Sequence, residues 1–295
     1  MSRGHRGERG ACALIGGIAL VAMLALGAGT AWGLTTRTAS TTVGPSPDAS
    51  STAAKCPRGK KVISGGFNNP GFDDFTSGSP GLFAYASHKS LGRRWTVAAQ
   101  NDNNGAGTEK AFVYCGNADS LSTRWVSATV PNMATRHRTL TARCPRGSQA
   151  ISGGFDNPGF TEDGGAGFFP FVSKQYRLRG WRVSVELFRP APATLKVFAY
   201  CRASGGVQTR SASATVATTG SQTASATASC KPGERLISGG YSTTSEQFPG
   251  GSIGPDLWYY GSHKSGRRGW KVSAFHNGGA VEDGRFKALA YCEDT

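Results

Sequence analysis

Polar and apolar residues alternate with a period of two in many short stretches of this chain, which is the pattern of β-strands with one buried face. The clearest stretches begin at tryptophans. In the first of them, Trp95 and Val97 share one face while Thr96 lies on the other. The same alternation begins at Trp181 and at Trp270. We therefore expect each of these tryptophans to be buried in a core.

A second kind of strand is apolar on both faces. Ala111, Val113 and Cys115 lie on one side, and Phe112 and Tyr114 lie on the other. A strand with this pattern is typical of the centre of a structure, where both of its faces are covered.

These strands belong to a unit that occurs three times. Each copy opens with a cysteine and a Pro-Gly turn, continues through Ser-Gly-Gly and an aromatic residue, and closes on a Tyr-Cys pair. Successive copies are 88 and then 86 residues apart. Glycine inside an apolar strand indicates a bulge or a close approach of backbones, which we expect at each Ser-Gly-Gly. The copies are assigned to residues 39–117, 124–203 and 210–295.

The stretch before each opening cysteine is rich in Ser and Thr, but its valine recurs at nearly the same distance from the cysteine, 13 residues in the first copy and 14 in the other two. It therefore predicts the first strand of each copy, at residues 40–43, 127–130 and 213–216. With about five or six short strands per copy, the sequence predicts an all-β fold of three tandem, small antiparallel β-sandwiches or partly open barrels. This fold would follow an N-terminal signal or anchor helix.

Six cysteines open and close the copies. A copy that folds as a unit favours pairing within it, so the expected disulfides are Cys56 with Cys115, Cys144 with Cys201 and Cys230 with Cys292. A copy of about 80 residues has a marginal core, and closing a loop of about 60 residues could add about 4 kcal/mol. Metal binding is the weaker alternative, because there is no Cys-x-x-Cys and no histidine recurs beside all the cysteines. We expect neither a metal nor a cofactor.

The N-terminus has the form of an export signal. Arg3, Arg6 and Arg9 precede an uncharged run over residues 11–34. Residues 1–34 are thus expected to be a signal peptide cleaved near Ala31, or an uncleaved single-pass membrane anchor. Either route places the rest of the chain outside the cell or at its surface, where paired cysteines oxidise.

The chain is basic, with 33 Lys and Arg against 18 Asp and Glu and a net charge of +15. Such a surface favours anionic partners. Export argues against nucleic acid, and contact with a membrane is expected only through residues 11–34 if they stay attached. An anionic polysaccharide or cell-wall polymer is therefore the expected partner, and a protein partner is the alternative.

A pair of aromatic residues followed by a basic cluster recurs in all copies. The aromatic residues are Phe83 and Tyr85, Phe169 and Phe171, and Trp258 and Tyr260. The cations are Lys89, Arg93 and Arg94, Lys174, Arg177 and Arg179, and Lys264, Arg267 and Arg268. Because residues i and i+2 share a strand face, each pair could form a flat stacking surface beside cations, suited to a sugar chain that carries phosphate, sulfate or carboxylate. Alternatively, the aromatic residues are core and the cations line a solvated hairpin.

Catalytic signals are weak. His88 and His263 match between copies and each follows a serine, but neighbouring strand residues point to opposite faces and no acid recurs beside them. Loop acids such as Asp73 and Glu162 could help to bind calcium beside Asn69 and Asn157, but solvated loop acids are the favoured interpretation, because the third copy offers only Glu246. We expect no enzyme activity.

The combined motif resembles a repeat of exported, mostly uncharacterised actinobacterial proteins. It consists of Cys-Pro-x-Gly, a Gly-Gly-aromatic step, a Gly-Trp-x-Val strand and a closing Tyr-Cys, and the resemblance covers residues 39–295. It implies export and a disulfide-bonded β fold, and it implies no reaction. The third copy departs from the motif, because Lys231 precedes its proline and the Asn-Pro-Gly turn is missing.

These observations predict an exported or surface-anchored, non-enzymatic protein that binds an anionic polymer of the cell envelope or its surroundings. A protein-binding module, such as a secreted protease inhibitor or an adhesion factor, is the first alternative. A hydrolase is the second.

Overall fold

The computed structural model of the protein describes ten stretches of the chain. They are residues 33–72, 80–117, 121–131, 137–160, 167–187, 191–203, 206–217, 222–243, 257–276 and 283–295. Residues 32–295 form one compact unit. The predicted signal or anchor lies outside the described residues except for its last two. In the described stretches no helix is long and apolar enough to cross a membrane.

Each copy of the motif forms six strands. The first copy contains β1 (Thr35–Val43), β2 (Ala49–Lys55), β3 (Lys61–Asn68), β4 (Leu82–Ser90), β5 (Arg94–Asn101) and β6 (Gly107–Gly116). The second contains β7 (Ser122–Val130), β8 (His137–Arg143), β9 (Ser148–Asp156), β10 (Phe168–Tyr176), β11 (Gly180–Leu187) and β12 (Ala193–Ala203). The third contains β13 (Gln208–Val216), β14 (Thr223–Ser229), β15 (Glu234–Thr243), β16 (Leu257–Ser265), β17 (Gly269–His276) and β18 (Gly284–Asp294).

The all-β prediction is confirmed, since the described residues contain strands and turns and no helix. The Ser- and Thr-rich stretches do form the first strands, β1, β7 and β13, which start a few residues before the expected positions. The strands with two apolar faces are β6, β12 and β18, and each lies between two partners in its sheet.

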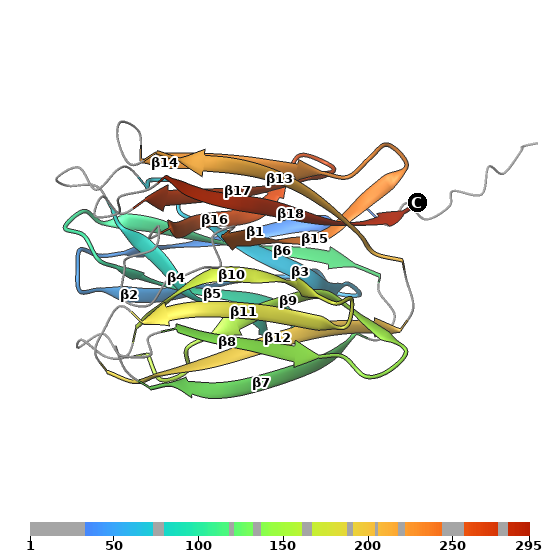
Figure 1. The fold of residues 1–295 in the computed structure, drawn as a ribbon, viewed down its shortest axis with the longest axis horizontal. Helices are drawn as coiled ribbons and strands as arrows, with labels where there is room; N and C mark the ends of the chain where they lie inside the picture. Colours follow the sequence, from blue (N-terminus) through green and yellow to red (C-terminus); the bar gives the residue numbers. More distant parts are fainter. Residues whose placement is uncertain are drawn as a thin grey trace, which may run out of the picture. The chain divides into compact units, whose positions relative to one another are not determined.

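The strands form three six-stranded sheets, and every sheet combines two repeats (Figure 1). Their orders are β1-β6-β3-β16-β17-β14, β2-β5-β4-β9-β12-β7 and β13-β18-β15-β10-β11-β8. The first, third and sixth strands of a repeat form one three-stranded half, and its other strands form a second half. The third strand of each repeat pairs with the fourth strand of a neighbour, as β3 does with β16, β9 with β4 and β15 with β10. Because the third repeat pairs back with the first, the arrangement closes on itself.

This sharing of sheets differs from the expected three separate sandwiches. Within a repeat the two halves do contact each other, but each half continues into a sheet that extends beyond its own repeat. An isolated repeat would leave its third and fourth strands as exposed edges with unpaired backbone groups. Pairing between repeats satisfies those edges.

Each repeat is held together internally by its disulfide and its tryptophan. The bonds Cys56–Cys115, Cys144–Cys201 and Cys230–Cys292 confirm the expected pairing. The first of each pair follows the second strand and the other lies in the sixth, so every disulfide joins the two halves of one repeat. Trp95, Trp181 and Trp270 are buried as expected, with no more than 2% of their surface exposed.

The two glycines of Ser-Gly-Gly have different tasks. A Cβ on Gly153 would lie 2.1 Å from the ring of Trp181 in the same repeat, and a Cβ on Gly154 would lie 2.3 Å from the carbonyl oxygen of Ser87 in the first repeat. The corresponding glycines of the other repeats meet the same kinds of neighbour. The first glycine therefore makes room for the core tryptophan, and the second lets the neighbouring repeat approach. A bulge also lies just before the motif, at Ile63 in the first repeat, so both expected features are present.

Candidate functional site

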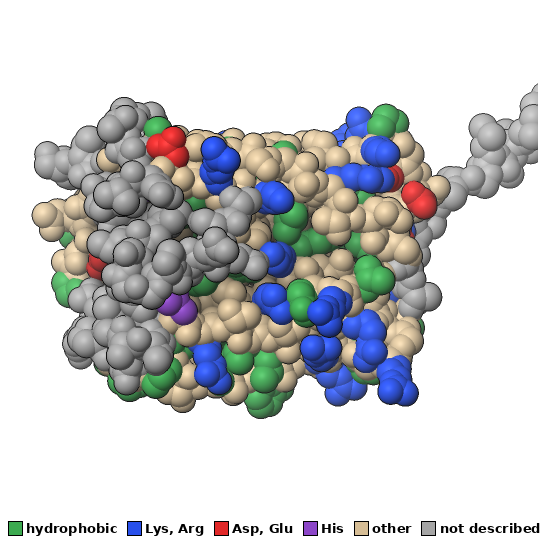
Figure 2. Space-filling model, viewed as in Figure 1, with side chains coloured by type: hydrophobic (Ala, Val, Ile, Leu, Met, Phe, Trp, Pro, Cys, Tyr) green, Lys and Arg blue, Asp and Glu red, His purple; other side chains and the backbone are tan. Residues whose placement is uncertain are grey.

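The basic clusters of all three repeats lie at one end of the compact unit. The hairpins β4–β5, β10–β11 and β16–β17 each dock against the turn that opens their own repeat, through hydrogen bonds from Cys56, Cys144 and Cys230 N–H to hairpin carbonyl groups. Figure 1 shows the β10–β11 hairpin at the right-hand side. Lys and Arg side chains gather toward the same side on the visible face in Figure 2. We call this part of the surface, made by the three hairpins and the turns beneath them, the basic end.

The cations of the basic end fall into two groups, and the first supports the fold. Arg93 donates a hydrogen bond of 2.9 Å to the carbonyl of Pro57, and Arg179 donates one of 2.9 Å to the carbonyl of Cys144. Lys174 donates to Ser242 Oγ at 2.9 Å. These side chains hold hairpins and neighbouring repeats together as well as carrying charge.

The lysines at the start of the hairpins are half-buried. Burial, together with the nearby charge of Lys61, lowers the pKa of Lys89. Burial and the charge of Arg267 lower the pKa of Lys264 in the same way. Burial is the larger cause of both pKa shifts, and the neighbouring cation is the smaller one.

The second group is exposed to solvent. It comprises Arg94, Arg177, Arg267 and Arg268, so that every hairpin contributes at least one exposed arginine, and Arg179 of the first group is exposed as well. Two hairpins also carry an exposed leucine near the tip, namely Leu91 (92% exposed) and Leu178 (60% exposed). The first strand starts at this end too, because Thr35 pairs with Cys115 at the end of β6.

The aromatic pairs lie elsewhere and are packed. Their first members, Phe83, Phe169 and Trp258, contact one another across the three repeats, with ring centroids 4.4 to 4.9 Å apart. Phe83 and Phe169 are buried. These three rings form a cluster at the starts of β4, β10 and β16.

The second members of the pairs have other neighbours. Tyr85 stacks on Phe160 at 4.0 Å and Tyr260 stacks on Phe72 at 4.4 Å. Phe171 contacts His137 edge to face at 6.0 Å. The register shifts in each strand at this residue, which interrupts the alternation and separates the two members of a pair. The geometry thus favours the core interpretation for these rings, and their binding role stays a prediction.

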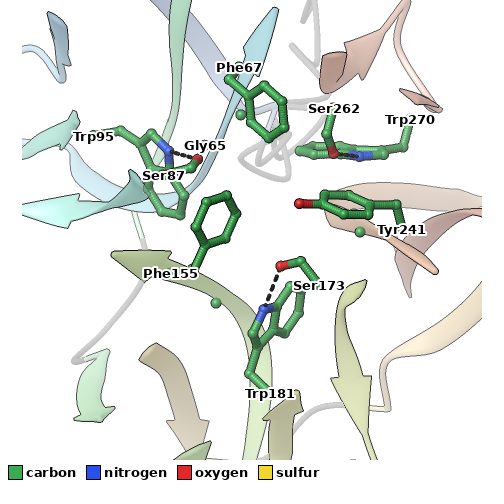
Figure 3. A pocket seen from close by; sticks show the side chains of 15 residues that line it. Gly65, Phe67, Ser87, Trp95, Phe155, Ser173, Trp181, Tyr241, Ser262 and Trp270 are labelled. Atoms are coloured by element: carbon green, nitrogen blue, oxygen red, sulfur yellow. Dashed lines mark hydrogen bonds between the residues drawn. The ribbon is translucent and has the colours of Figure 1, made fainter. Parts of the chain in front are cut away.

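Three aromatic residues also meet at the centre of the sheets. Phe67, Phe155 and Tyr241, the aromatic residues of the three Ser-Gly-Gly motifs, converge there with Trp–Ser hydrogen bonds around them (Figure 3). The cavity between them measures about 20 Å³. A space of this size holds about one water molecule, so it is too small for a ligand.

The serines and histidines considered for catalysis have structural partners. Ser87 Oγ accepts a hydrogen bond of 3.0 Å from Trp95 Nε1, and Ser262 does the same for Trp270. His88 stacks on Phe198 with its Nδ1 3.1 Å from a backbone oxygen. In this arrangement neither serine is paired with the histidine that follows it.

The proposed calcium ligands are only partly described. Asp73 and Glu162 lie outside the described residues, while Asn69 and Asn157 are buried. One other group, Cys230, Glu234 and Cys292, has metal-like spacing. Its sulfur atoms are bonded to each other, and the Arg210 guanidinium pairs with Glu234 and lowers its pKa to about 2. These residues therefore offer no thiolate and no free carboxylate to an ion.

One exposed aromatic residue in the described part of the chain was not predicted from the sequence. Trp125 in β7 is 61% exposed, and the ammonium of Lys196 lies 4.7 Å from the centre of its ring. The signal was a difference between copies, because the residues at the same place in the first and third repeats are Thr38 and Ser211.

Comparison with known proteins adds no assignment. No protein-family model matches the chain, and no curated protein matches it. The resemblance to exported actinobacterial repeats accordingly stays an expectation.

Proposed function

We propose that this protein is an exported or surface-anchored, non-enzymatic binding protein, and that its basic end binds an anionic polymer of the cell envelope or its surroundings. The observation that carries the proposal is the gathering of exposed arginines from three hairpins, far apart in the sequence, on one end of a single compact unit.

Three repeated hairpins suit a polymer better than a small anion. A polymer presents many equivalent charges, so that binding at one hairpin raises the effective concentration of the next charge at another. Each exposed pair of charges contributes little by itself. The affinity for the polymer therefore comes from the number of such charge pairs, and it falls as salt screens the charges.

Export is supported by the disulfides. Three bonds of this kind indicate an oxidising environment, which agrees with a signal peptide cleaved near Ala31 or an anchor over residues 11–34.

A binding panel with the oxidised full chain tests the proposal. The probes are dextran sulfate, hyaluronan and polyphosphate as anionic polymers, uncharged dextran, and vesicles with and without anionic phospholipid. We expect binding to the anionic polymers at about 0.1 M NaCl that weakens strongly at about 1 M, where the Debye length falls to about 3 Å. Binding to anionic vesicles alone would replace the polymer with a lipid surface, a result that the exposed Leu91 and Leu178 would then explain. No salt-sensitive binding to any of the anionic polymers or vesicles would contradict the proposal and favour the inhibitor or adhesion alternative.

A further inference from the structure

A second surface, separate from the hairpin tips, lies where the first two repeats meet. Trp125 in β7 is directly opposite Phe198 in β12, and these residues therefore share one face of the sheet. Lys196 lies two positions before Phe198 on the same strand, and its ammonium is 4.7 Å from the Trp125 ring and 5.2 Å from the Phe198 ring. The ammonium of Lys196 thus lies over one face of the Trp125 ring, and 61% of the surface of Trp125 is exposed to solvent.

Polar groups complete this surface. His88, from β4 of the first repeat, stacks on Phe198 at 5.0 Å with nearly parallel rings. Its Nε2 atom lies 3.9 Å from a carboxylate oxygen of Asp156, which is the residue paired with Lys196 in the sheet. Both side chains of the His88–Asp156 pair remain about one fifth exposed. Trp125, Lys196, Asp156 and His88 therefore lie on one face of the same sheet, with Lys196 and Phe198 between the tryptophan and the other two, and we call this set the Trp125 face.

The repeats provide an internal comparison. The equivalent face between the third and first repeats keeps Phe112, Lys110 and His263 but has Thr38 in place of the tryptophan and Asn68 in place of the aspartate. The face between the second and third repeats keeps only the lysine of this set. There, the phenylalanine is replaced by Leu289 and the tryptophan by Ser211. The aspartate is replaced by Ser242 and the histidine by Lys174. The structural role common to the three faces needs neither Trp125 nor Asp156, so these residues are free to serve another purpose.

The side chains of the Trp125 face are of the kinds that bind an acidic sugar. A flat exposed indole stacks on the C–H face of a pyranose ring, while a carboxylate and an imidazole at its side bind ring hydroxyl groups. An ammonium group next to the indole favours a sugar that carries an anionic substituent. The Trp125 face also adjoins the basic end, because Lys89 follows His88 in the chain and its N–H donates to Tyr200 Oη on the strand that carries Phe198.

We propose that the Trp125 face binds one sugar residue of an acidic glycan, with the pyranose stacked on Trp125 and its hydroxyl groups on Asp156 and His88. This inference rests on the proposed function and deepens it, since it makes the anionic polymer a glycan. The hairpins of the basic end then bind charges farther along the same chain.

The test compares Trp125→Ala and Trp125→Phe in the oxidised full chain, with hyaluronan and polyphosphate as probes measured by calorimetry. We expect Trp125→Ala to weaken hyaluronan binding by about tenfold and Trp125→Phe to weaken it less. Polyphosphate has no sugar ring, so its affinity should be the same for all three proteins. The thermal unfolding midpoint should not change, because the indole is exposed.

A gain of function supplies the complementary test. Thr38→Trp with Asn68→Asp builds the missing groups on the face that already holds Phe112, Lys110 and His263, and it should increase the number of hyaluronan sites or its affinity. Ser211→Trp with Ser242→Asp is the matched control and should have a smaller effect, because Leu289 and Lys174 replace the phenylalanine and the histidine there.

The outcomes separate the two proposals. Equal binding of hyaluronan by the unchanged protein and by Trp125→Ala, with salt-sensitive binding of both probes, would overturn the sugar site and leave the basic end in place. A loss of polyphosphate binding equal to the loss of hyaluronan binding would also overturn it, because Trp125 would then act through charge or folding. No binding of either probe would contradict both proposals.

Discussion

The hydroxyl group of Tyr200, in the second repeat, accepts a hydrogen bond of 2.6 Å from the backbone N–H of Lys89 in the first repeat. The next residue, Cys201, forms its disulfide with Cys144 in its own repeat. The Tyr-Cys pair therefore makes one connection within a repeat and one between repeats. The cysteine forms the disulfide of its own repeat, and the tyrosine binds the neighbouring repeat. The tyrosines of the other two pairs, Tyr114 and Tyr291, make the equivalent bonds at 2.7 Å.

Removing the Tyr200 hydroxyl should destabilise the whole fold. Tyr200→Phe leaves the N–H of Lys89 without its partner between two repeats, which should cost about 1 to 3 kcal/mol of unfolding free energy. Tyr176→Phe is the control and should change stability by less than about 0.5 kcal/mol, because the half-buried ring keeps its contacts with Arg177 and Arg182 when only the hydroxyl group is removed. Urea unfolding of the oxidised proteins measures both, and equal effects would show that the bond between repeats contributes nothing specific.

The second glycine of Ser-Gly-Gly should tolerate no side chain. In Gly154→Ala the new Cβ would lie 2.3 Å from the backbone oxygen of Ser87, so the first and second repeats would have to separate. We expect a loss of several kcal/mol, comparable to the most severe overpacking of a core. Gly159→Ala is the matched control because nothing lies within 4 Å of its Cβ position. Similar melting temperatures for the two variants would contradict the close approach of the repeats.

Glu109 should make stability depend on pH. It is fully buried in β6 where the other repeats have Leu195 and Phe286, and burial raises its pKa well above the ordinary value. The folded protein therefore keeps a proton that the unfolded chain releases above about pH 4.3. Its unfolding free energy should fall by up to about 1.4 kcal/mol per pH unit from there up to the raised pKa.

Glu109→Leu tests this assignment. The variant should be more stable than the unchanged protein at pH 7, and the difference should shrink as the pH falls toward 4. Leu195→Glu, at the equivalent position of the second repeat, should likewise make the unfolding free energy fall as the pH rises. Denaturant unfolding at several pH values measures the unfolding free energy of both variants. If this free energy changes with pH in the same way for the unchanged protein and for Glu109→Leu, the pKa of Glu109 is not raised in the folded protein.

The sequence predicts what is local to one repeat. Alternation around Trp95 and the two apolar faces around Tyr114 identify strands, and cysteines that recur in register identify the disulfides. The sharing of sheets is not visible in the same way, because β3 can pair equally well, by its pattern, with β4 of its own repeat or with β16 of another. The second glycine of Ser-Gly-Gly was the available signal for a close neighbour, but it does not say which repeat supplies that neighbour.

The candidate site was predictable only in part. The cations recur beside a strand that begins at a tryptophan, so their placement on hairpins follows from the alternation. The bulge at Tyr85 cannot be read from the pattern, and it is the reason that Phe83 and Tyr85 have separate neighbours. Trp125 could have been found by asking where the copies differ, since a tryptophan replaces Thr38 and Ser211 of the other repeats at a polar position.

The most direct test of the basic end removes one exposed arginine from each hairpin, as Arg94→Gln, Arg177→Gln and Arg267→Gln together. The matched control removes three other positive charges, as Lys110→Gln, Arg138→Gln and Lys287→Gln, which lie on strands away from the hairpin tips. The measurement is the affinity for polyphosphate as a function of NaCl concentration between about 0.1 M and about 1 M. The account predicts that the hairpin variant binds much more weakly at low salt and loses most of its salt dependence, while the control keeps both. Equal affinity and equal salt dependence in the two variants would contradict a binding site at the basic end.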